Sequence, residues 1–433
     1  MSLFRSTCFI VVLLSAVRTG FAQDSRRSLD LTVGGVGISI GDSRRVNGLR
    51  LNFRDSRLEK VNGINATIWT PYRDGDGDIT GLSLGLPATG GRHVTGLMAA
   101  FFGGAVTEDF AGISVAGLGM GVGGNAKGII IGGLGGGVGG SVSGLTVGGL
   151  GAGVGGDVEG IAIGGLGFGA GGRATGILLG GLGAGVGGDV SGLAVGGLGI
   201  ASGGRINGIM VGGLGVGAGG GGKGVLIGGL GAGVGGPFEG LLVGGVGAGV
   251  GGTFRGIALT GVGMGVGGPF SGISIAGVGA GVGGAATGVM VNGVGMGVGG
   301  DATGIFINGF GMGAGGTIRW LSINGFGVGA SRLEGVHIGG AAVGTPHAKG
   351  LMLAGLWLRI REEEGRFRRR DALFEGVGAS AFNQVLGHQK GLTIGLINYA
   401  WSLSGVQLGL LNIVRDNPPA RRVLPILNWG SRK

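Results

Sequence analysis

The chain has 433 residues, of which 122 are glycine and only 12% are charged, whereas globular proteins average about 7% glycine and about 25% charged residues. Glycine does not recur at every third position, which excludes a collagen triple helix, and the hydrophobic 43% of the chain recurs at fixed places, which excludes a disordered chain. The formal net charge of +10 comes from scattered basic residues without a set of aromatic residues beside them, which fits anionic lipid or polysaccharide better than nucleic acid.

Residues 1–22 have the composition of a secretory signal peptide. A short basic start precedes an apolar stretch at 8–17, and small residues end at Ala22. We therefore expect export and cleavage after Ala22, with an N-terminal membrane anchor as the alternative. Cys8 is the only cysteine and would leave with the signal, so the exported chain is expected to hold no disulfide, no thiolate metal site and no lipid-attachment cysteine.

Residues 23–95 carry an irregular form of a repeat that becomes regular further along the chain. The segments VNGLRLNF, VNGINATIW and ITGLSLGLP each place an apolar residue directly after a glycine. Those three glycines, Gly48, Gly63 and Gly81, are 15 and 18 residues apart. The sequence therefore predicts N-terminal coils of variable length.

The longest of these coils contains Asp74, Asp76 and Asp78 in the sequence DGDGD. Carboxylates at alternate positions of a glycine-rich loop can supply oxygen ligands to Ca²⁺. A solvated turn insertion explains the same residues, because no glutamate completes the EF-hand pattern downstream. We take the three aspartates as a candidate calcium loop and expect no other cofactor.

Residues 96–349 contain a glycine-rich repeat with a period of sixteen. Thirteen units begin at glycines from Gly112 to Gly304, and the unit from Gly144 reads GLTVGGLGAGVGGDVE. With the first glycine as position one, apolar residues recur at positions two, four, seven, nine, eleven and fifteen, and Gly-Gly pairs fall at five and six and at twelve and thirteen. Alternating apolar residues indicate strands and Gly-Gly pairs indicate bends, so each unit is predicted to form two strands and two bends.

Residues at the same position of consecutive units form series of related side chains. Charges alternate in sign at two positions, while phenylalanine and asparagine repeat at two others. The series are Asp157, Arg173, Asp189 and Arg205 at position fourteen; Lys223, Glu239 and Arg255 at sixteen; Phe238, Phe254 and Phe270 at fifteen; and Asn292, Asn308 and Asn324 at five. If units stack about 4.8 Å apart, these series become ladders of paired charges, stacked rings and amides.

The ladders predict an all-β fold, a parallel two-sided β-solenoid with coils of about 16 residues. The alternative is an outer-membrane-type antiparallel β-barrel, although strands of five or six residues are shorter than the about nine to eleven that cross a membrane. We expect positions two and four to point inward and position three, often large and apolar, to point outward. Such an apolar outer sheet would mark contact with a partner or a membrane, unless another part of the chain covers it.

Residues 350–390 continue the coils around a charged insertion at 359–371, RIREEEGRFRRRD. A run this rich in arginine and glutamate is typical of a solvated excursion from a sheet. The alternative is a docking surface for anionic lipid or polysaccharide.

Residues 391–433 return to a shorter repeat of fourteen residues and end in a cap. The sequence GLTIGLINYAWSLSGVQLGLLNIV precedes NPPARRVLPILNW, and Asn398, Asn412 and Asn428 form a second asparagine series. These units resemble the leptospiral-type surface-repeat family of exported glycine-rich bacterial proteins, over residues 391–429 and more loosely over the two N-terminal segments VNGLRLNF and VNGINATIW. The resemblance implies an exported envelope protein of undefined activity. The chain differs from the lipoprotein members in lacking a cysteine at the cleavage point.

We therefore expect an exported, non-catalytic structural or surface-interaction protein of the bacterial cell envelope, located in the periplasm, in the outer membrane or at the cell surface. Its apolar sheet face would contact the outer membrane or an envelope polysaccharide. The alternative is an outer-membrane β-barrel with a pore-like role. No catalytic residue is expected, because the G-x-S-x-G match at 81–85 is an ordinary repeat start and G-x-G-x-x-G recurs in almost every unit.

Overall fold

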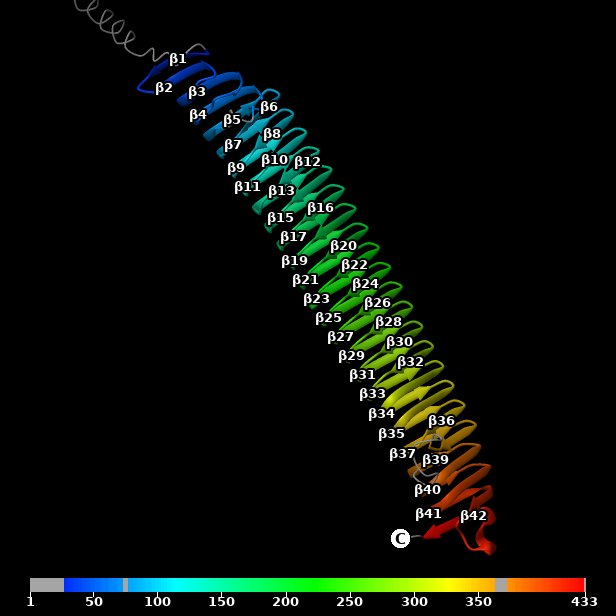
Figure 1. The fold of residues 1–433 in the computed structure, drawn as a ribbon. Helices are drawn as coiled ribbons and strands as arrows, with labels where there is room; N and C mark the ends of the chain where they lie inside the picture. Colours follow the sequence, from blue (N-terminus) through cyan, green and yellow to red (C-terminus); the bar gives the residue numbers. More distant parts are fainter. Residues whose placement is uncertain (1–26, 73–76, 363–371, 432–433) are drawn as a thin grey trace, which may run out of the picture. The chain divides into compact units, whose positions relative to one another are not determined.

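The protein is an all-β parallel β-solenoid of about 22 turns, as seen in a computed structural model that describes residues 27–72, 77–362 and 372–431. The chain divides into two compact units, Met1–Gly212 and Gly213–Lys433, and each is a stack of coils (Figure 1). In the regular repeats, each residue of a strand pairs with the residue sixteen positions later in a parallel ladder. The solenoid prediction is therefore confirmed, and the barrel alternative is wrong because neighbouring strands run in the same direction.

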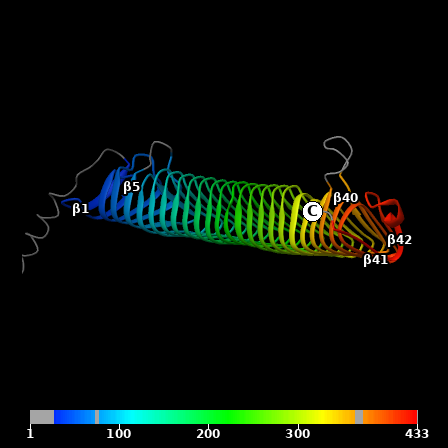
Figure 2. The same ribbon diagram turned by 90° about the horizontal axis from the view of Figure 1, so that it is seen from below.

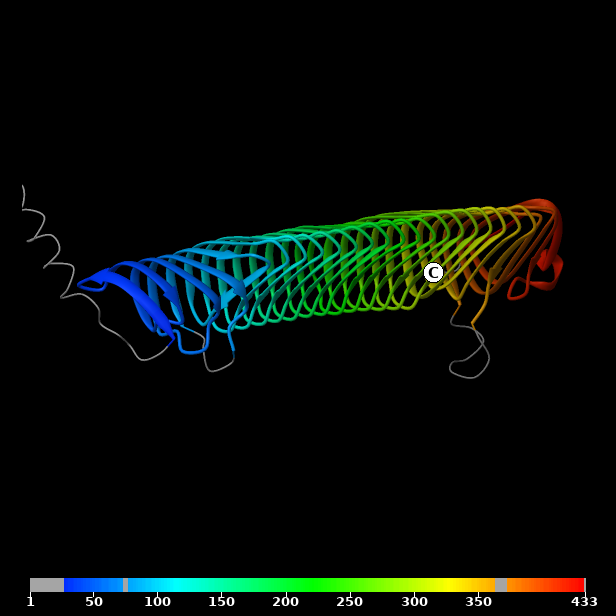
Figure 3. The same cartoon turned by 90° about the horizontal axis from the view of Figure 1, so that it is seen from above.

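Each regular coil contributes one strand of seven residues, from position fifteen to position five, and one of four residues, from eight to eleven. The two kinds of strand form separate rows in each unit (Figure 1). Figures 2 and 3 show the coils of each unit from two opposite sides. Positions in the irregular coils follow from their strand register with the regular ones.

The strand bounds of the first unit are, in the long row, β3 Arg45–Arg54, β4 Lys60–Trp69, β5 Asp78–Gly85, β7 Val94–Ala100, β9 Phe110–Ala116, β11 Ala126–Gly132, β13 Val142–Gly148, β15 Val158–Gly164, β17 Ala174–Gly180, β19 Val190–Gly196 and β21 Ile206–Gly212. The short row holds β6 Ala88–Gly91, β8 Gly103–Val106, β10 Gly119–Val122, β12 Gly135–Val138, β14 Gly151–Val154, β16 Gly167–Ala170, β18 Gly183–Val186 and β20 Gly199–Ser202. A hairpin of β1 Ser28–Val33 and β2 Val36–Gly41 precedes both rows.

In the second unit the long row is β23 Gly222–Gly228, β25 Phe238–Gly244, β27 Phe254–Thr260, β29 Phe270–Ala276, β31 Ala286–Asn292, β33 Ala302–Asn308, β37 His347–Ala354 and β39 Leu373–Ala379. The short row is β22 Gly215–Ala218, β24 Gly231–Val234, β26 Gly247–Val250, β28 Gly263–Val266, β30 Gly279–Val282, β32 Gly295–Val298, β36 Ala342–Thr345 and β38 Trp357–Ile360. Four longer strands, β34 Gly311–Asn324, β35 Gly327–Gly339, β40 Phe382–Ile394 and β41 Ile397–Val414, run through both rows, and the 3₁₀ turn η2 Pro419–Arg421 and β42 Val423–Ser431 end the unit.

Glycine at position one lets successive coils approach closely. In every regular unit this residue has a positive φ, between 117° at Gly128 and 151° at Gly208. A Cβ atom on Gly160 would lie 2.1 Å from the carbonyl oxygen of Gly144 in the preceding coil. Both the backbone conformation and the space therefore require glycine here.

The core lies between the two rows of strands, and its composition corrects one expectation. Position three is buried, not outward: Met210, Leu242 and Phe306 are fully buried. Positions two and four point outward, as Ile161 and Ile273 show. The reason is that the long strand begins at the buried position fifteen and its residues alternate in direction, so positions fifteen, three and five face the core.

Side chains at positions three and nine meet in the core. The Oγ of Ser274, at position three, lies 3.2 Å from the Sδ of Met264, at position nine of the preceding coil. A Cβ on Gly104, at position nine, would lie 2.9 Å from Cε of Met98 at position three of the same coil. The two positions have complementary sizes in many coils: Ala162 accompanies Phe168, and Leu178 accompanies Ala184.

Antiparallel strands close the N-terminal end of the first unit and the C-terminal end of the second. β1 pairs antiparallel with β2, and β42 pairs antiparallel with β41. Near the N-terminal hairpin, the fully buried Arg50 donates a hydrogen bond of 2.5 Å to Asp55 and forms an ion pair of 3.3 Å with Asp42. These two carboxylates compensate the buried charge of Arg50 at the N-terminal end of the apolar core.

Candidate functional site

Positions two and four of the long strands form an exposed surface that we call the apolar face. From the coil at Gly48 to the coil at Gly405, every one of these residues is Ile, Leu, Val or Ala. Exposed fractions reach 51% at Leu97 in the first unit and 49% at Ile275 in the second. In contrast, the buried position three accepts polar residues such as Ser114 and His337. The outward positions are therefore more strictly apolar than the core, although folding alone would allow polar residues there.

Position seven adds an apolar edge at the corner between the two rows. It is leucine, then valine, then phenylalanine along the regular repeats, and its side chains are about half exposed, for example 51% at Leu166. The rings of Phe310 and Phe326 stack with centroids 4.7 Å apart. These two rings therefore stack like with like along the coils, and both are about half exposed to solvent.

The outer surface of the short strands is mostly bare backbone. Positions eight and ten are glycine in most regular coils. A Cβ atom on Gly169 or Gly185, both at position ten, would meet no atom within 4 Å. The fold leaves room for side chains at position ten, so this surface offers sites for control substitutions.

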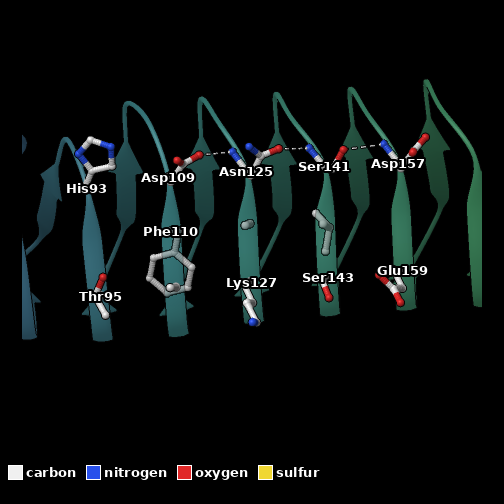
Figure 4. A pocket seen from close by; sticks show the side chains of 13 residues that line it. His93, Thr95, Asp109, Phe110, Asn125, Lys127, Ser141, Ser143, Asp157 and Glu159 are labelled. Carbon is white, nitrogen blue, oxygen red and sulfur yellow. Dashed lines mark hydrogen bonds between the residues drawn. The ribbon is translucent and has the colours of Figure 1, made fainter.

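A polar corner lies at positions fourteen to sixteen, where the first unit has a groove of about 500 Å³ (Figure 4). A chain of hydrogen bonds follows the groove from coil to coil. The carboxylate of Asp109 accepts the N–H of Asn125 (2.7 Å), and the amide oxygen of Asn125 accepts the N–H of Ser141 (2.9 Å). The hydroxyl oxygen of Ser141 accepts the N–H of Asp157 (3.0 Å). These side chains satisfy backbone donors at the bends, which is a structural role.

The predicted charge ladder at position fourteen is confirmed for the pair Asp157 and Arg173. The aspartates there also accept hydrogen bonds from the backbone of the next coil. Asp157 accepts the N–H of Arg173 at 2.7 Å, while the guanidinium of Arg173 lies 3.6 Å from the other carboxylate oxygen. Asp189 accepts the N–H of Arg205 at 2.6 Å. Sequence comparison reveals the alternating signs, but not that the backbone N–H is the nearer partner.

At position sixteen, Lys223, Glu239 and Arg255 are neighbours in the parallel register and are exposed. Within the described residues no ion pair joins these three side chains to one another or to another group. Further along, Arg319 lies 3.4 Å from Glu334 and Lys390 lies 3.3 Å from Glu375. The predicted alternation is therefore present, and its first three members keep their charges unpaired.

The other predicted ladders are also formed. Phe238, Phe254 and Phe270 stack with centroid distances of 6.2 and 5.6 Å. The amide of Asn292 donates to Asn308 and that of Asn308 donates to Asn324, both at 2.9 Å.

In the C-terminal series, Asn398 donates to the amide oxygen of Asn412 at 2.7 Å. The side chain of Asn428 donates instead to the backbone carbonyl of Asn412 at 3.3 Å, because β42 is antiparallel and brings a different part of the neighbour into reach. Of the asparagine series predicted for the tail, only Asn398 and Asn412 are therefore joined side chain to side chain.

Of the three aspartates predicted to bind calcium, Asp74 and Asp76 lie outside the described residues. Asp78 begins β5, where its carboxylate lies 3.1 Å from both Arg92 and His93. Burial opposes ionisation of Asp78, but hydrogen bonds from His93 and Arg92 outweigh it and lower the pKa. Across the described residues no group of three or more His, Cys, Asp or Glu side chains could hold a metal ion, and the calcium loop stays a prediction.

His337, at position three, is the one histidine that the core fully buries among the described residues. Its Nδ1 lies 2.8 Å from the hydroxyl of Ser322, and its Nε2 has no hydrogen-bond partner within the described part of the chain. Burial lowers its pKa to about 4, against a weaker opposing effect of a backbone hydrogen bond at Glu334. The imidazole is therefore neutral at pH 7.

The predicted signal peptide and most of the charged insertion, residues 363–371, lie outside the described residues. In the part that is described, none of the helical segments has the length and hydropathy that a membrane span needs. Comparisons of the chain with family models, with curated proteins and with solved structures found no match. The resemblance to the surface-repeat family therefore stays a prediction.

Proposed function

We propose that the protein is an exported, non-catalytic structural protein of the bacterial cell envelope, and that it acts by burying its apolar face against another surface. The observation that carries this proposal is the composition of positions two and four, which are Ile, Leu, Val or Ala in every coil although they face outward. An apolar surface of this kind, present in each unit, is typical of a contact with a partner or a membrane. The signal-like composition of residues 1–22 supports export.

The free energy available from this face is large. Burying apolar surface contributes about 25 cal/mol per Å², so even partial burial of two side chains per coil adds up over many coils. A chain that gained nothing from such contacts would be expected to carry polar residues at some of these positions, as position three does.

Expression of the full chain in a Gram-negative host, followed by fractionation and carbonate washing, tests the proposal. We expect a processed protein, shortened at Ala22, in the washed envelope fraction. The variant Ile273→Lys/Ile305→Lys, which places two charges on the apolar face, should move to the soluble periplasmic fraction because a buried lysine is costly.

The matched control is Gly281→Lys/Gly313→Lys, which adds the same charges to the same coils at position ten, where a Cβ meets open space. This control should remain in the envelope. Retention of an unprocessed chain in the cytoplasm, or equal behaviour of the two variants, would contradict the proposal.

A further inference from the structure

We propose that, in the second unit, the apolar face binds the same face of a second copy of the chain, with the two stacks of coils antiparallel. This inference rests on the proposed function only in taking the apolar face as a contact surface. It goes further in naming the partner and the register.

The area of the face is sufficient for a stable dimer. Eleven coils of the second unit, from Gly224 to Gly391, each present two outward aliphatic side chains. At roughly 50 Å² of exposed surface per side chain, the face measures on the order of 1,000 Å², compared with about 800 Å² per partner in a standard protein interface. Two flat aliphatic sheets can pack face to face about 10 Å apart, as in a β-sandwich.

Aliphatic side chains do not fix the orientation or the register of two packed faces. Residues at the border of the apolar face must therefore do so. Position sixteen lies next to the face on the same outward side of each long strand. Its residues are, in order, Lys223, Glu239, Arg255, Ser271, Thr287, Thr303, Arg319, Glu334, Lys349, Glu375 and Lys390. Opposite charges at a border determine orientation and register more than they determine affinity.

When two copies lie antiparallel, the charges at position sixteen of one copy lie opposite charges of the other sign in the second copy. A two-fold axis between Thr287 and Thr303 places Lys223 opposite Glu375, Glu239 opposite Lys349, and Arg255 opposite Glu334 of the second copy. Each of these pairs occurs twice in the dimer, and no like charges face each other.

Other registers are less favourable. A shift by one coil would set Lys223 against Lys390 and Glu239 against Glu375, which are like charges. A shift by two coils in either direction keeps opposite charges together but forms fewer such pairs. Because Lys223, Glu239 and Arg255 have no ion-pair partner in their own chain within the described residues, they are available to the second copy.

Trp320 supports the location of this contact. It occupies position one, where the regular coils have glycine, with a φ of 84°, and 66% of its surface is exposed. A positive φ is unfavourable for a bulky residue, and residues with such strain cluster at functional sites. In the proposed register Trp320 faces the coil of Ser271 and Gly272, where small residues leave space for it.

Sedimentation equilibrium of the purified protein at micromolar concentrations tests the dimer. We expect a dimer for the natural chain and for the control Gly281→Lys/Gly313→Lys, and a monomer for Ile273→Lys/Ile305→Lys. Circular dichroism confirms that each variant is folded. A natural chain that stays monomeric, or a face variant that dimerises as the natural chain does, would overturn the inference.

A charge exchange tests the antiparallel register. Glu239→Lys puts lysine opposite Lys349 twice in its own dimer, and Lys349→Glu puts glutamate opposite Glu239 twice. Each variant alone should dimerise about tenfold more weakly, because two attractive pairs become repulsive. An equimolar mixture should regain the natural affinity as a heterodimer, because both of its pairs are opposite. Unchanged affinity of the single variants, or no preference for the heterodimer, would overturn the register.

A last comparison separates this inference from the proposed function. If the chain is a monomer but its apolar face binds vesicles of phosphatidylethanolamine and phosphatidylglycerol, the dimer is wrong and the contact surface stands. If the chain is a monomer and binds no such vesicle, and the face variant is retained in the envelope, both proposals fail.

Discussion

Glycine serves two different purposes at positions one and ten of the same coil. At position one, Gly160 has a φ of 124° and its missing Cβ would collide with the backbone of the preceding coil. At position ten, Gly169 has open space at its missing Cβ. Steric demand thus explains the first glycine and leaves the second unexplained.

An alanine pair tests this distinction. Gly160→Ala should destabilise the protein by more than about 3 kcal/mol, because both the positive φ and the close approach are unfavourable for alanine. Gly169→Ala should be neutral or stabilise by up to about 1 kcal/mol, since it restricts the unfolded chain. Chemical denaturation of both variants provides the measurement, and equal losses of stability would show that the close contact between coils is not the cause.

The burial of His337 makes the free energy of unfolding depend on pH. Its pKa of about 4 in the folded chain lies below the value of 6.5 expected for an exposed histidine, so the unfolded chain binds the proton more readily. The stabilising contribution is complete above pH 6.5 and is lost as the pH falls to 4, by roughly 3 kcal/mol in total.

The variant His337→Gln removes this titration. The difference in unfolding free energy between the natural chain and the variant should shrink, or change sign, between pH 7 and pH 4. Urea denaturation across that range measures the difference and cancels the titration of carboxylates common to both chains. A difference that does not vary with pH would mean that the imidazole is accessible to protons in the folded state.

Within one coil, facing strands share a fixed core volume. In many coils a large residue at position three or nine accompanies a small residue at the other, which keeps the core between the rows filled. Phe168→Ala alone should cost about 3–5 kcal/mol through the cavity it leaves, and Ala162→Leu alone about 1–3 kcal/mol through crowding.

The double variant Ala162→Leu/Phe168→Ala reproduces the arrangement found in the next coil, Leu178 with Ala184. It should recover more than half of the summed losses, which a double-mutant cycle by thermal unfolding would reveal. Additive losses would show that the two side chains do not share space.

The period, the parallel register and the ladders could be predicted from the sequence, because residues one period apart in the sequence are also neighbours in the structure. Phe254, for example, lies between Phe238 and Phe270. The inward side of the long strand could not. Positions two and four, held here by Ile161 and Ile163, are apolar in every coil, whereas position three, held here by Ala162, varies. Apolar periodicity alone therefore assigns positions two and four to the core. The apolar sheet was therefore expected at position three, whereas the structure places it at positions two and four.

The polar corner was also only partly predictable. Asp157 and Arg173 have opposite charges one unit apart, which suggests an ion pair, but the shortest contact joins the carboxylate to the backbone N–H of Arg173. That contact depends on the direction of the N–H at the bend, which the alternation of charges does not specify.

We expect the apolar face to be covered when the protein is in the envelope. Single cysteines can report this, because the chain contains no cysteine other than Cys8. With Cys8 replaced by serine, Ile275→Cys places a thiol on the apolar face and Gly281→Cys places one on the bare surface of the short strands. Ile275 is half exposed in the single chain, so both thiols are open to reagent unless a partner covers one of them.

The deciding measurement is the rate of maleimide labelling of these two variants in isolated envelopes, each normalised to its rate in urea. We expect the thiol of Ile275→Cys to react at least about tenfold more slowly than that of Gly281→Cys, in proportion to the fraction of time the face is uncovered. Equal labelling rates in the envelope would contradict this expectation, because they would show the apolar face open to solvent where the protein works.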